Sequence, residues 1–337
     1  MVNIRDIAKK SGVSPATVSR VINNPQLVSP QKRENILKVI EEYKFIPNRL
    51  AVSLIKKKSG TVGLLIPVIS NLFFPEIIEA IEGVLYKEGF NLFLSISNDS
   101  IEEEKNAFQN FLQMRIEGAI VIGSRRRKYQ YIKHIIKLAE QIPIVLVNEY
   151  LSSEGIYCVY NDESWGAYKA VKYLVESGHR NIGFINGNII YSTFFNKLEG
   201  YKQALLEAKL SIKDKLIVSI PKNDVQNGYQ GTIRLLEQNK KLDGLFVCSD
   251  FAAIGVLRAL QKRGIHIPKD VSVIGYDNTS ISSMLYPSLT TVDQQGYKLG
   301  TVAANLMKRL IDGEKIMNNL MKFYPNVIIR ESVKSKL

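Results

Sequence analysis

From Thr61 onward, short apolar runs alternate with longer amphipathic stretches, and this alternation limits the fold more than any other feature. The runs are almost entirely apolar and lie at 62–66, 91–96, 118–122, 144–147, 182–185, 216–218, 245–248 and 271–274. Segments of helical period follow them, such as 76–87 and 102–115. This pattern is typical of parallel sheets that are covered by helices on both faces. Because one sheet of so many strands would be unusually large, we expect two doubly wound units.

The first 58 residues differ from the rest in charge. The chain has a net charge of +13, and residues 1–58 contain twelve Lys and Arg against four Asp and Glu. A small basic region before a nearly balanced large one indicates a nucleic-acid-binding module joined to a second domain. A solvated basic surface would have the same composition, so charge alone does not decide between them.

Gly12 lies between two short stretches of helical period and predicts a helix-turn-helix. It permits a tight turn, while Ser14 can cap the second helix and Pro15 suits the first position of that helix. Small Ala8 lets the two helices approach closely. Asp6 is favourable in the first turn of the first helix. The expected buried faces consist of apolar residues at helical spacing, namely Ile4, Ile7, Ala8, Val18, Val21 and Ile22.

A third helix follows, with Ser29 as its expected cap and Pro30 after the cap. Pro47 closes the helical region. The expected apolar positions of this helix are Ile36, Leu37, Val39 and Ile40.

Two motifs in this region resemble the lac/gal repressor (LacI/GalR) family. Residues 13–23 read VSPATVSRVIN and look like the family's recognition helix, and residues 43–54 read YKFIPNRLAVSL and look like its hinge. The motifs occur in order at the expected separation, and the likeness extends along essentially the whole chain.

The resemblance implies a small all-α helix-turn-helix DNA-binding domain at 1–58, with a hinge helix at 48–56. It also implies an α/β periplasmic-binding-protein-like domain at 59–337 that binds an effector and dimerises. This second domain would consist of two doubly wound parallel-sheet subdomains. One would span about 60–158 with 292–322, and the other about 159–291 with 323–332.

We expect the second helix to read DNA in the major groove. Arg20 could pair bidentately with guanine, although a plain surface charge is the alternative. The family's hinge inserts a leucine into the minor groove, and Leu54 matches it; alternatively, Leu54 packs in a helix contact. Val52 stands where many members have Arg. The expected DNA-binding residues are Arg5, Ser14, Pro15, Ala16, Thr17, Ser19, Arg20, Asn23, Ser29, Asn48 and Leu54.

Ligands of doubly wound sheets bind beyond the carboxyl ends of the strands, so polar and aromatic residues at those ends are effector candidates. We expect one of Phe73 and Phe74 to line the cleft and the other to pack in the core. Asp250 caps a helix or contacts ligand, and both interpretations stay open. The expected effector-binding residues are Asn71, Phe73, Phe74, Asp99, Lys197, Ser249, Asp277 and Gln294. Lys197 and Ser249 depart from the Arg and Asn that are common in the family.

Other classes of protein fit the sequence less well. It has no P-loop, no GxGxxG after an expected strand and no GxSxG elbow, so we expect no enzyme. Cys158 and Cys248 lie in apolar runs and read as reduced core residues. With only three histidines, and none in a ligand-like pair, we expect neither a metal nor a cofactor.

The chain begins without an apolar signal segment and contains no apolar run of membrane-spanning length. We therefore expect a cytoplasmic protein without membrane contact, and this argues against a secreted solute-binding protein of similar fold.

The expected partners are a palindromic double-stranded operator, a carbohydrate-like effector and a second copy of the chain in a homodimer. No apolar heptad extension follows Ser332, so we expect no tetramerisation tail. An alternative keeps DNA binding but replaces the small effector with a seryl-phosphorylated carrier protein. The basic run 125–128 could serve such a partner or form an exposed loop. Titrating the phosphorylated carrier against the protein–DNA complex would discriminate between the two.

Overall fold

The computed structural model describes residues 2–45, 59–123, 132–239 and 241–334, which fall into two units, Met1–Ser59 and Gly60–Leu337. Hinge residues Asn48 and Leu54 and the basic run 125–128 therefore lie outside the described residues.

The first unit is a small helical domain. In its described residues the helices are α1 (Ile4–Ser11), α2 (Pro15–Asn23) and α3 (Pro30–Glu42), with a 3-10 turn at η1 (Pro25–Leu27). Gly12 ends α1 in the left-handed conformation at φ +66°, as a tight turn requires. Ser14 caps α2 by accepting a bond from the Thr17 amide. The buried core consists of Ile7, Ala8, Val18, Val21 and Ile36, which confirms the helix-turn-helix arrangement.

Three details of this unit differ from the sequence expectation. Asn3 and Asp6 form a reciprocal capping box at the start of α1, a stronger start signal than a favourable charge alone. Ser29 occupies the cap position of α3 but makes no capping bond with its side chain. Leu37 is 47% exposed, because the apolar face of this short helix is filled by Ile36 and the half-buried Val39 and Ile40.

The second unit contains two parallel sheets of different size. The first has six strands in the order β11-β5-β4-β3-β1-β2, and the second has four in the order β7-β6-β8-β9. The strands of the first are β1 (Thr61–Ile66), β2 (Asn91–Ile96), β3 (Gly118–Ile122), β4 (Ile144–Val147), β5 (Ile156–Asn161) and β11 (Leu320–Phe323). Those of the second are β6 (Ile182–Asn186), β7 (Ile217–Ser219), β8 (Gly244–Val247) and β9 (Ser272–Ile274). We call the two parts the six-stranded half and the four-stranded half.

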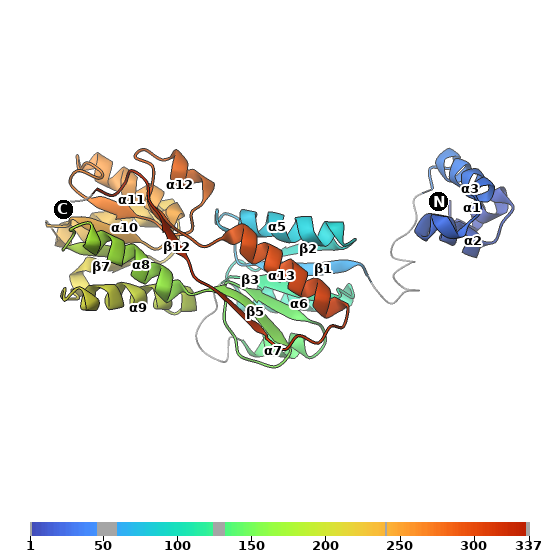
Figure 1. Cartoon of the computed structure of the whole chain (residues 1–337), viewed down its shortest axis with the longest axis horizontal. Helices are drawn as coiled ribbons and strands as arrows, with labels where there is room; N and C mark the ends of the chain where they lie inside the picture. The colour runs from blue at the N-terminus through green and yellow to red at the C-terminus, as the bar shows by residue number, and fades with distance from the viewer. Residues whose placement is uncertain (1, 46–58, 124–131, 240, 335–337) are drawn as a thin grey trace. The chain divides into compact units, whose positions relative to one another are not determined.

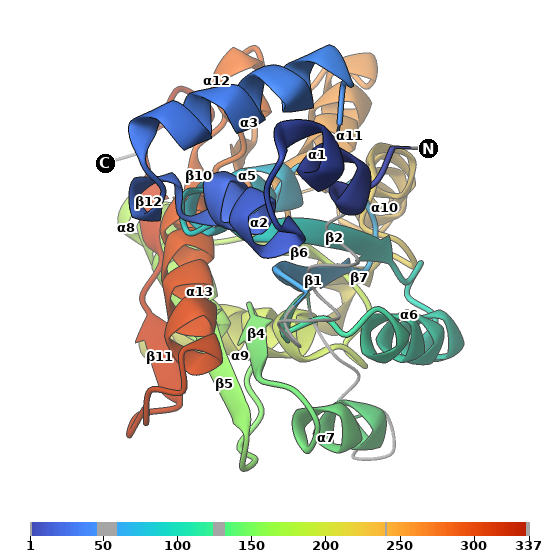
Figure 2. The same cartoon turned by 90° about the vertical axis from the view of Figure 1, so that its right-hand side faces the viewer.

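Helices cover both faces of the sheet in the six-stranded half. These helices are α5 (Phe74–Lys87), α6 (Ile101–Gln113), α7 (Lys133–Ala139) and α13 (Gly296–Ile311). α5 and α13 pack on one face with Leu64 and Ile120, while α6 and α7 pack on the other with Leu65 and Val121. Figure 2 shows α13 on the opposite side of the strands from α6 and α7. Consecutive strand residues thus serve two cores, which explains why these runs are apolar throughout.

The four-stranded half is layered in the same way. Its helices are α8 (Glu163–Glu176), α9 (Ser192–Glu207), α10 (Val225–Gln238), α11 (Asp250–Lys262) and the short α12 (Ser280–Met284), with a 3-10 turn at η3 (Asp214–Leu216). α8 and α9 lie on one face of its sheet, and α10 and α11 lie on the other (Figure 1). The two halves are joined where β5 leads into α8, and again through the antiparallel pair β10 (Thr291–Asp293) and β12 (Asn326–Ile328).

Candidate functional site

The recognition candidate α2 has one buried and one exposed side. Val18 and Val21 are buried, whereas Arg20 in the last turn is exposed. Four other candidates, Ser14, Pro15, Ala16 and, on α1, Arg5, are exposed, and Ser29 before α3 is exposed as well. Thr17 and Ser19 are half-buried, and the Thr17 hydroxyl lies 2.9 Å from that of Ser14. Asn23 ends the helix. The helix therefore exposes a polar side to solvent, while its apolar side packs in the core and fixes its position.

A cleft of about 630 Å³ lies between the two halves of the larger unit, a volume typical of small-molecule sites. Its walls are built from residues that follow β1, β2, β3 and β4 in one half and β6, β7, β8 and β9 in the other. This is the carboxyl edge of both sheets. Seven of the eight effector candidates line it, namely Asn71, Phe73, Phe74, Asp99, Lys197, Asp277 and Gln294.

Phe73 and Phe74, at the start of α5, both line the cleft and are both buried in the core, so the expected division into one core and one cleft residue is wrong. The Asn71 carboxamide oxygen accepts a bond from the Phe73 amide and holds the start of α5. The two rings, with centroids 6.1 Å apart, can thus serve the core and the cleft together. Tyr191, Phe194 and Phe251 add aromatic surface from the four-stranded half.

Asp277 is held in an unusual position on the floor of the cleft. Its φ is +113°, which is rare for a residue with a side chain and is typical of functional sites. Its carboxylate accepts a 2.6 Å bond from the Gln294 side-chain amide, and Gln294 in turn accepts from Asn161. Burial raises the pKa of Asp277 well above its usual range, while nearby Lys197 opposes this shift.

Lys197 is only 3% exposed and is held on three sides. Its ammonium group donates to the Cys248 carbonyl at 3.0 Å and lies 3.4 Å from the Glu163 carboxylate. It also lies 3.6 Å from the centre of the Tyr276 ring, within the range of a cation–π contact.

Ser249 and Asp250 lie behind the cleft and not on its wall. Ser249 caps α11 by accepting from the Ala252 amide, and it donates to the side-chain oxygen of Asn223, which does line the cleft. Asp250 is fully buried and accepts bonds from the Thr279 amide and hydroxyl and from the Thr291 hydroxyl. Asp250 therefore joins α11 to β10, and the capping role belongs to Ser249.

Two residues of the site, Asn148 and Glu163, are not among the candidates expected from the sequence. Asn148 follows β4 and lines the cleft, so its position at a strand end was an available signal. Glu163 lies in the first turn of α8 and contacts Asn148 and Lys197. Glu163 does not line the cleft itself, and only the three-dimensional arrangement brings it against two residues that do.

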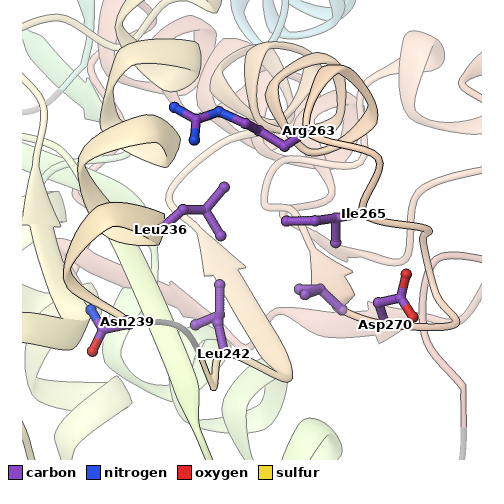
Figure 3. A pocket seen from close by; sticks show the side chains of 7 residues that line it. Leu236, Asn239, Leu242, Arg263, Ile265 and Asp270 are labelled. Atoms are coloured by element: carbon purple, nitrogen blue, oxygen red, sulfur yellow. The ribbon is translucent and has the colours of Figure 1, made fainter.

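A second hollow, of about 380 Å³, opens at the other edge of the four-stranded sheet. Leu236, Leu242 and Ile265 line it together with Arg263 and Asp270 (Figure 3). The Asp270 carboxylate accepts bonds from the amide and ring of His266. None of the effector candidates lines this hollow, so the cleft is the candidate binding site.

Neither a metal site nor a membrane segment occurs in the described part of the chain. No group of three or more His, Cys, Asp or Glu side chains is placed there to hold a metal ion. No helix there combines the length and apolar character needed to cross a bilayer.

Both parts of the chain match known protein families. Residues 3–48 match the family model "Bacterial regulatory proteins, lacI family", and residues 171–333 match a periplasmic binding protein-like domain. Catabolite control protein A of Priestia megaterium is 34% identical over 99% of each chain. The chain belongs to the lacI family. Like its relatives, this lacI-family protein is a DNA-binding transcriptional regulator and not an enzyme.

Two solved structures show the same architecture as this lacI-family regulator. The lac repressor dimer bound to operator matches with a TM-score of 0.89 and 25% identity over 99% of each chain. A complex of the transcriptional regulator CelR with cellobiose matches with a TM-score of 0.74 and 26% identity, covering 98% of this chain and all of the other. The two-domain order and both parallel sheets are thus confirmed.

Proposed function

We propose that this regulator represses transcription by binding a palindromic operator as a homodimer, and that a carbohydrate in the cleft controls its operator affinity. The observation that carries this proposal is the joining of a helix-turn-helix to a cleft whose walls come from two separate sheets. A ligand that bridges both halves changes their relative position, and the related lac repressor binds operator as a dimer.

On DNA, α2 occupies the major groove of one half-site, because a helix of nine residues reads only a few base pairs. The second protomer reads the other half-site by symmetry. The hinge around Asn48 and Leu54 is assigned to the operator centre from the family resemblance alone. Because operator binding requires access to DNA, the proposed site of action is the cytoplasm.

In the cleft, Asp277 and Gln294 are the proposed contacts for sugar hydroxyl groups. A carboxylate that accepts two bonds from a diol is left unsatisfied by a ligand that lacks it, which gives selectivity. The cellobiose complex of the related regulator supports a carbohydrate as the ligand class.

Selection from a random double-stranded DNA library tests the first half of the proposal. The full-length protein should enrich a palindrome with two equal half-sites, and sedimentation of the complex should show two protomers per duplex. Enrichment of no sequence, or of a single half-site bound by one protomer, would contradict it. Adding sugars to the selected complex then tests whether the cleft controls DNA affinity.

A further inference from the structure

The charged groups on the cleft floor are already paired with one another. The Lys197 ammonium lies 3.4 Å from the Glu163 carboxylate. Glu163, itself 4% exposed, also accepts a bond from the Asn148 side chain. A cation that is already paired with a buried carboxylate has little attraction left for an anionic ligand.

The remaining charges of the cleft wall do not reverse this balance. Among the described residues, Asp99, Asp224 and Asp277 line the cleft against Lys197 and Lys222. Lys197 is paired with Glu163, and Lys222 is exposed at the surface close to Asp224 in the sequence, so neither of these two lysines offers a phosphate group an unopposed positive charge in the partly closed site.

Two buried carboxamide oxygens, that of Asn148 in the cleft lining and that of Asn161 behind Gln294, have no hydrogen-bond donor in the described part of the chain. The Asn148 amide nitrogen faces the Glu163 carboxylate, which only accepts, so the orientation of the carboxamide is fixed. Its oxygen is buried and has no hydrogen-bond partner in the described part of the chain. The oxygen of Asn161 is in the same condition beside Gln294. The hydroxyl groups of a sugar donate to such atoms, whereas the phosphate group of an ester, as a dianion, has no proton to donate in place of the hydroxyl that it replaces.

The aromatic side chains of the cleft favour a ligand with a ring. Phe73 and Phe74 lie on one wall and Phe194 and Phe251 on the other. Flat apolar surface on both sides suits a ring with C–H faces and hydroxyl edges.

We propose that the effector is an uncharged sugar that binds as a hydrogen-bond donor, and that the cleft rejects the phosphate esters of the same sugars. This inference rests on the proposed function, because it specifies the ligand of the same cleft.

Matched pairs of ligands test the charge preference directly. The probes are D-ribose, D-glucose and cellobiose, with ribose 5-phosphate and glucose 6-phosphate, and binding to the full-length protein is measured by thermal shift and calorimetry. At least one neutral sugar should bind, and where its phosphate ester is available the ester should bind at least tenfold more weakly. An ester that binds as well as or better than its parent sugar would overturn the proposal, as would binding by none of the neutral sugars.

The variant Glu163→Gln tests the physical cause, because it removes the counter-ion of Lys197 and leaves the size of the side chain unchanged. The ratio of affinities for glucose and glucose 6-phosphate should fall about tenfold. Glu199→Gln is the matched control, since Glu199 lies on α9 as Lys197 does but is exposed and pairs with Lys202. An unchanged ratio in folded Glu163→Gln would overturn the proposal.

A second variant keeps the test decisive if Glu163→Gln does not fold. Asp224 caps α10 by accepting from the Asn227 amide, and asparagine caps helices equally well. Asp224→Asn should therefore keep the fold and shift the same ratio about threefold toward the phosphate ester; no shift would count against the proposal.

Operator affinity is measured on each preparation. Operator binding with a preference for phosphate esters would reject this inference alone, whereas loss of operator binding by the wild-type chain would reject the proposed function.

Discussion

At the scale of single residues, position in the fold decides what a charged side chain does. Arg20 is exposed on the polar side of α2, whereas Asp250 is enclosed between α11 and β10 and accepts three hydrogen bonds. The first is placed to meet a partner, and the second holds two segments of the chain together. Their substitutions should consequently be detected by different measurements.

Replacing Arg20 with alanine should relax base preference at one position of each half-site. A bidentate pair with guanine discriminates by about 1–3 kcal/mol, so the variant should accept other bases there while keeping its preference elsewhere. Repeating the library selection with Arg20→Ala measures this. An equal loss of affinity for all sequences would instead show that Arg20 contacts the phosphate backbone.

Stability should depend on pH through Asp250. Burial raises its pKa from 3.8 to about 6, so the folded state binds this proton more tightly than the unfolded chain. The resulting stability is complete below about pH 4 and is lost as the pH rises through 6. The difference in the free energy of unfolding between the wild type and Asp250→Asn should therefore shift against the wild type by up to about 2–3 kcal/mol as the pH rises across this range. Denaturation of both proteins at pH 4 to 7.5 measures it, and a difference that grows with pH would contradict the assignment.

At the scale of elements, close helix packing depends on particular glycines. A β-carbon at Gly200 on α9 would lie 2.0 Å from the Ser164 carbonyl oxygen on α8, so the two helices would have to separate. At Gly83 on α5, the same atom would meet nothing within 4 Å.

Gly200→Ala should destabilise the larger unit by about 1–3 kcal/mol, because added volume between packed helices forces the backbone to shift. Gly83→Ala should stabilise it by up to about 1 kcal/mol, because alanine favours the helix. Denaturation of the full chain, followed by the fluorescence of Trp165, compares the two. If both substitutions had the same sign, the close approach of α8 and α9 would not be what Gly200 provides.

The elements were predictable from the sequence where the signal is local. Most of the predicted strands begin and end within a residue of those observed, because apolar runs and turn residues mark them directly. The apolar run around Cys158 was recognised but was not counted among the expected strands, and it forms β5 (Ile156–Asn161). The pair β10 and β12 was missed because Thr291 meets Ile328 only in the folded chain. The cleft residues Asn71 and Asp277 follow strands in the sequence, so their positions alone made them candidates. Glu163 could be recognised only from its contacts in the folded chain.

At the scale of the whole molecule, the proposed coupling between ligand and DNA must pass through the segments that join the two halves. Trp165, the only tryptophan of the chain, lies on α8 next to the first crossing. Its ring meets Tyr324 edge-on at 6.1 Å, and Tyr324 lies between β11 and β12. On the proposed mechanism an effector closes the cleft and moves these crossing segments, so effector binding should alter the emission of Trp165. Trp165→Phe is the silent control for the same titration.

The emission of Trp165 permits a test of the coupling itself. If effector binding changes operator affinity by some factor, operator must change effector affinity by the same factor, because both describe one thermodynamic cycle. Coupling between such sites is typically worth about 1–3 kcal/mol, or roughly 5- to 150-fold. Sugar affinity is measured from Trp165 emission with and without saturating operator, and operator affinity is measured by anisotropy with and without sugar. The two factors should agree within error. Equal sugar affinity in the presence and absence of operator would show that the cleft and the helix-turn-helix act independently, and would end the proposal that the cleft controls the gene.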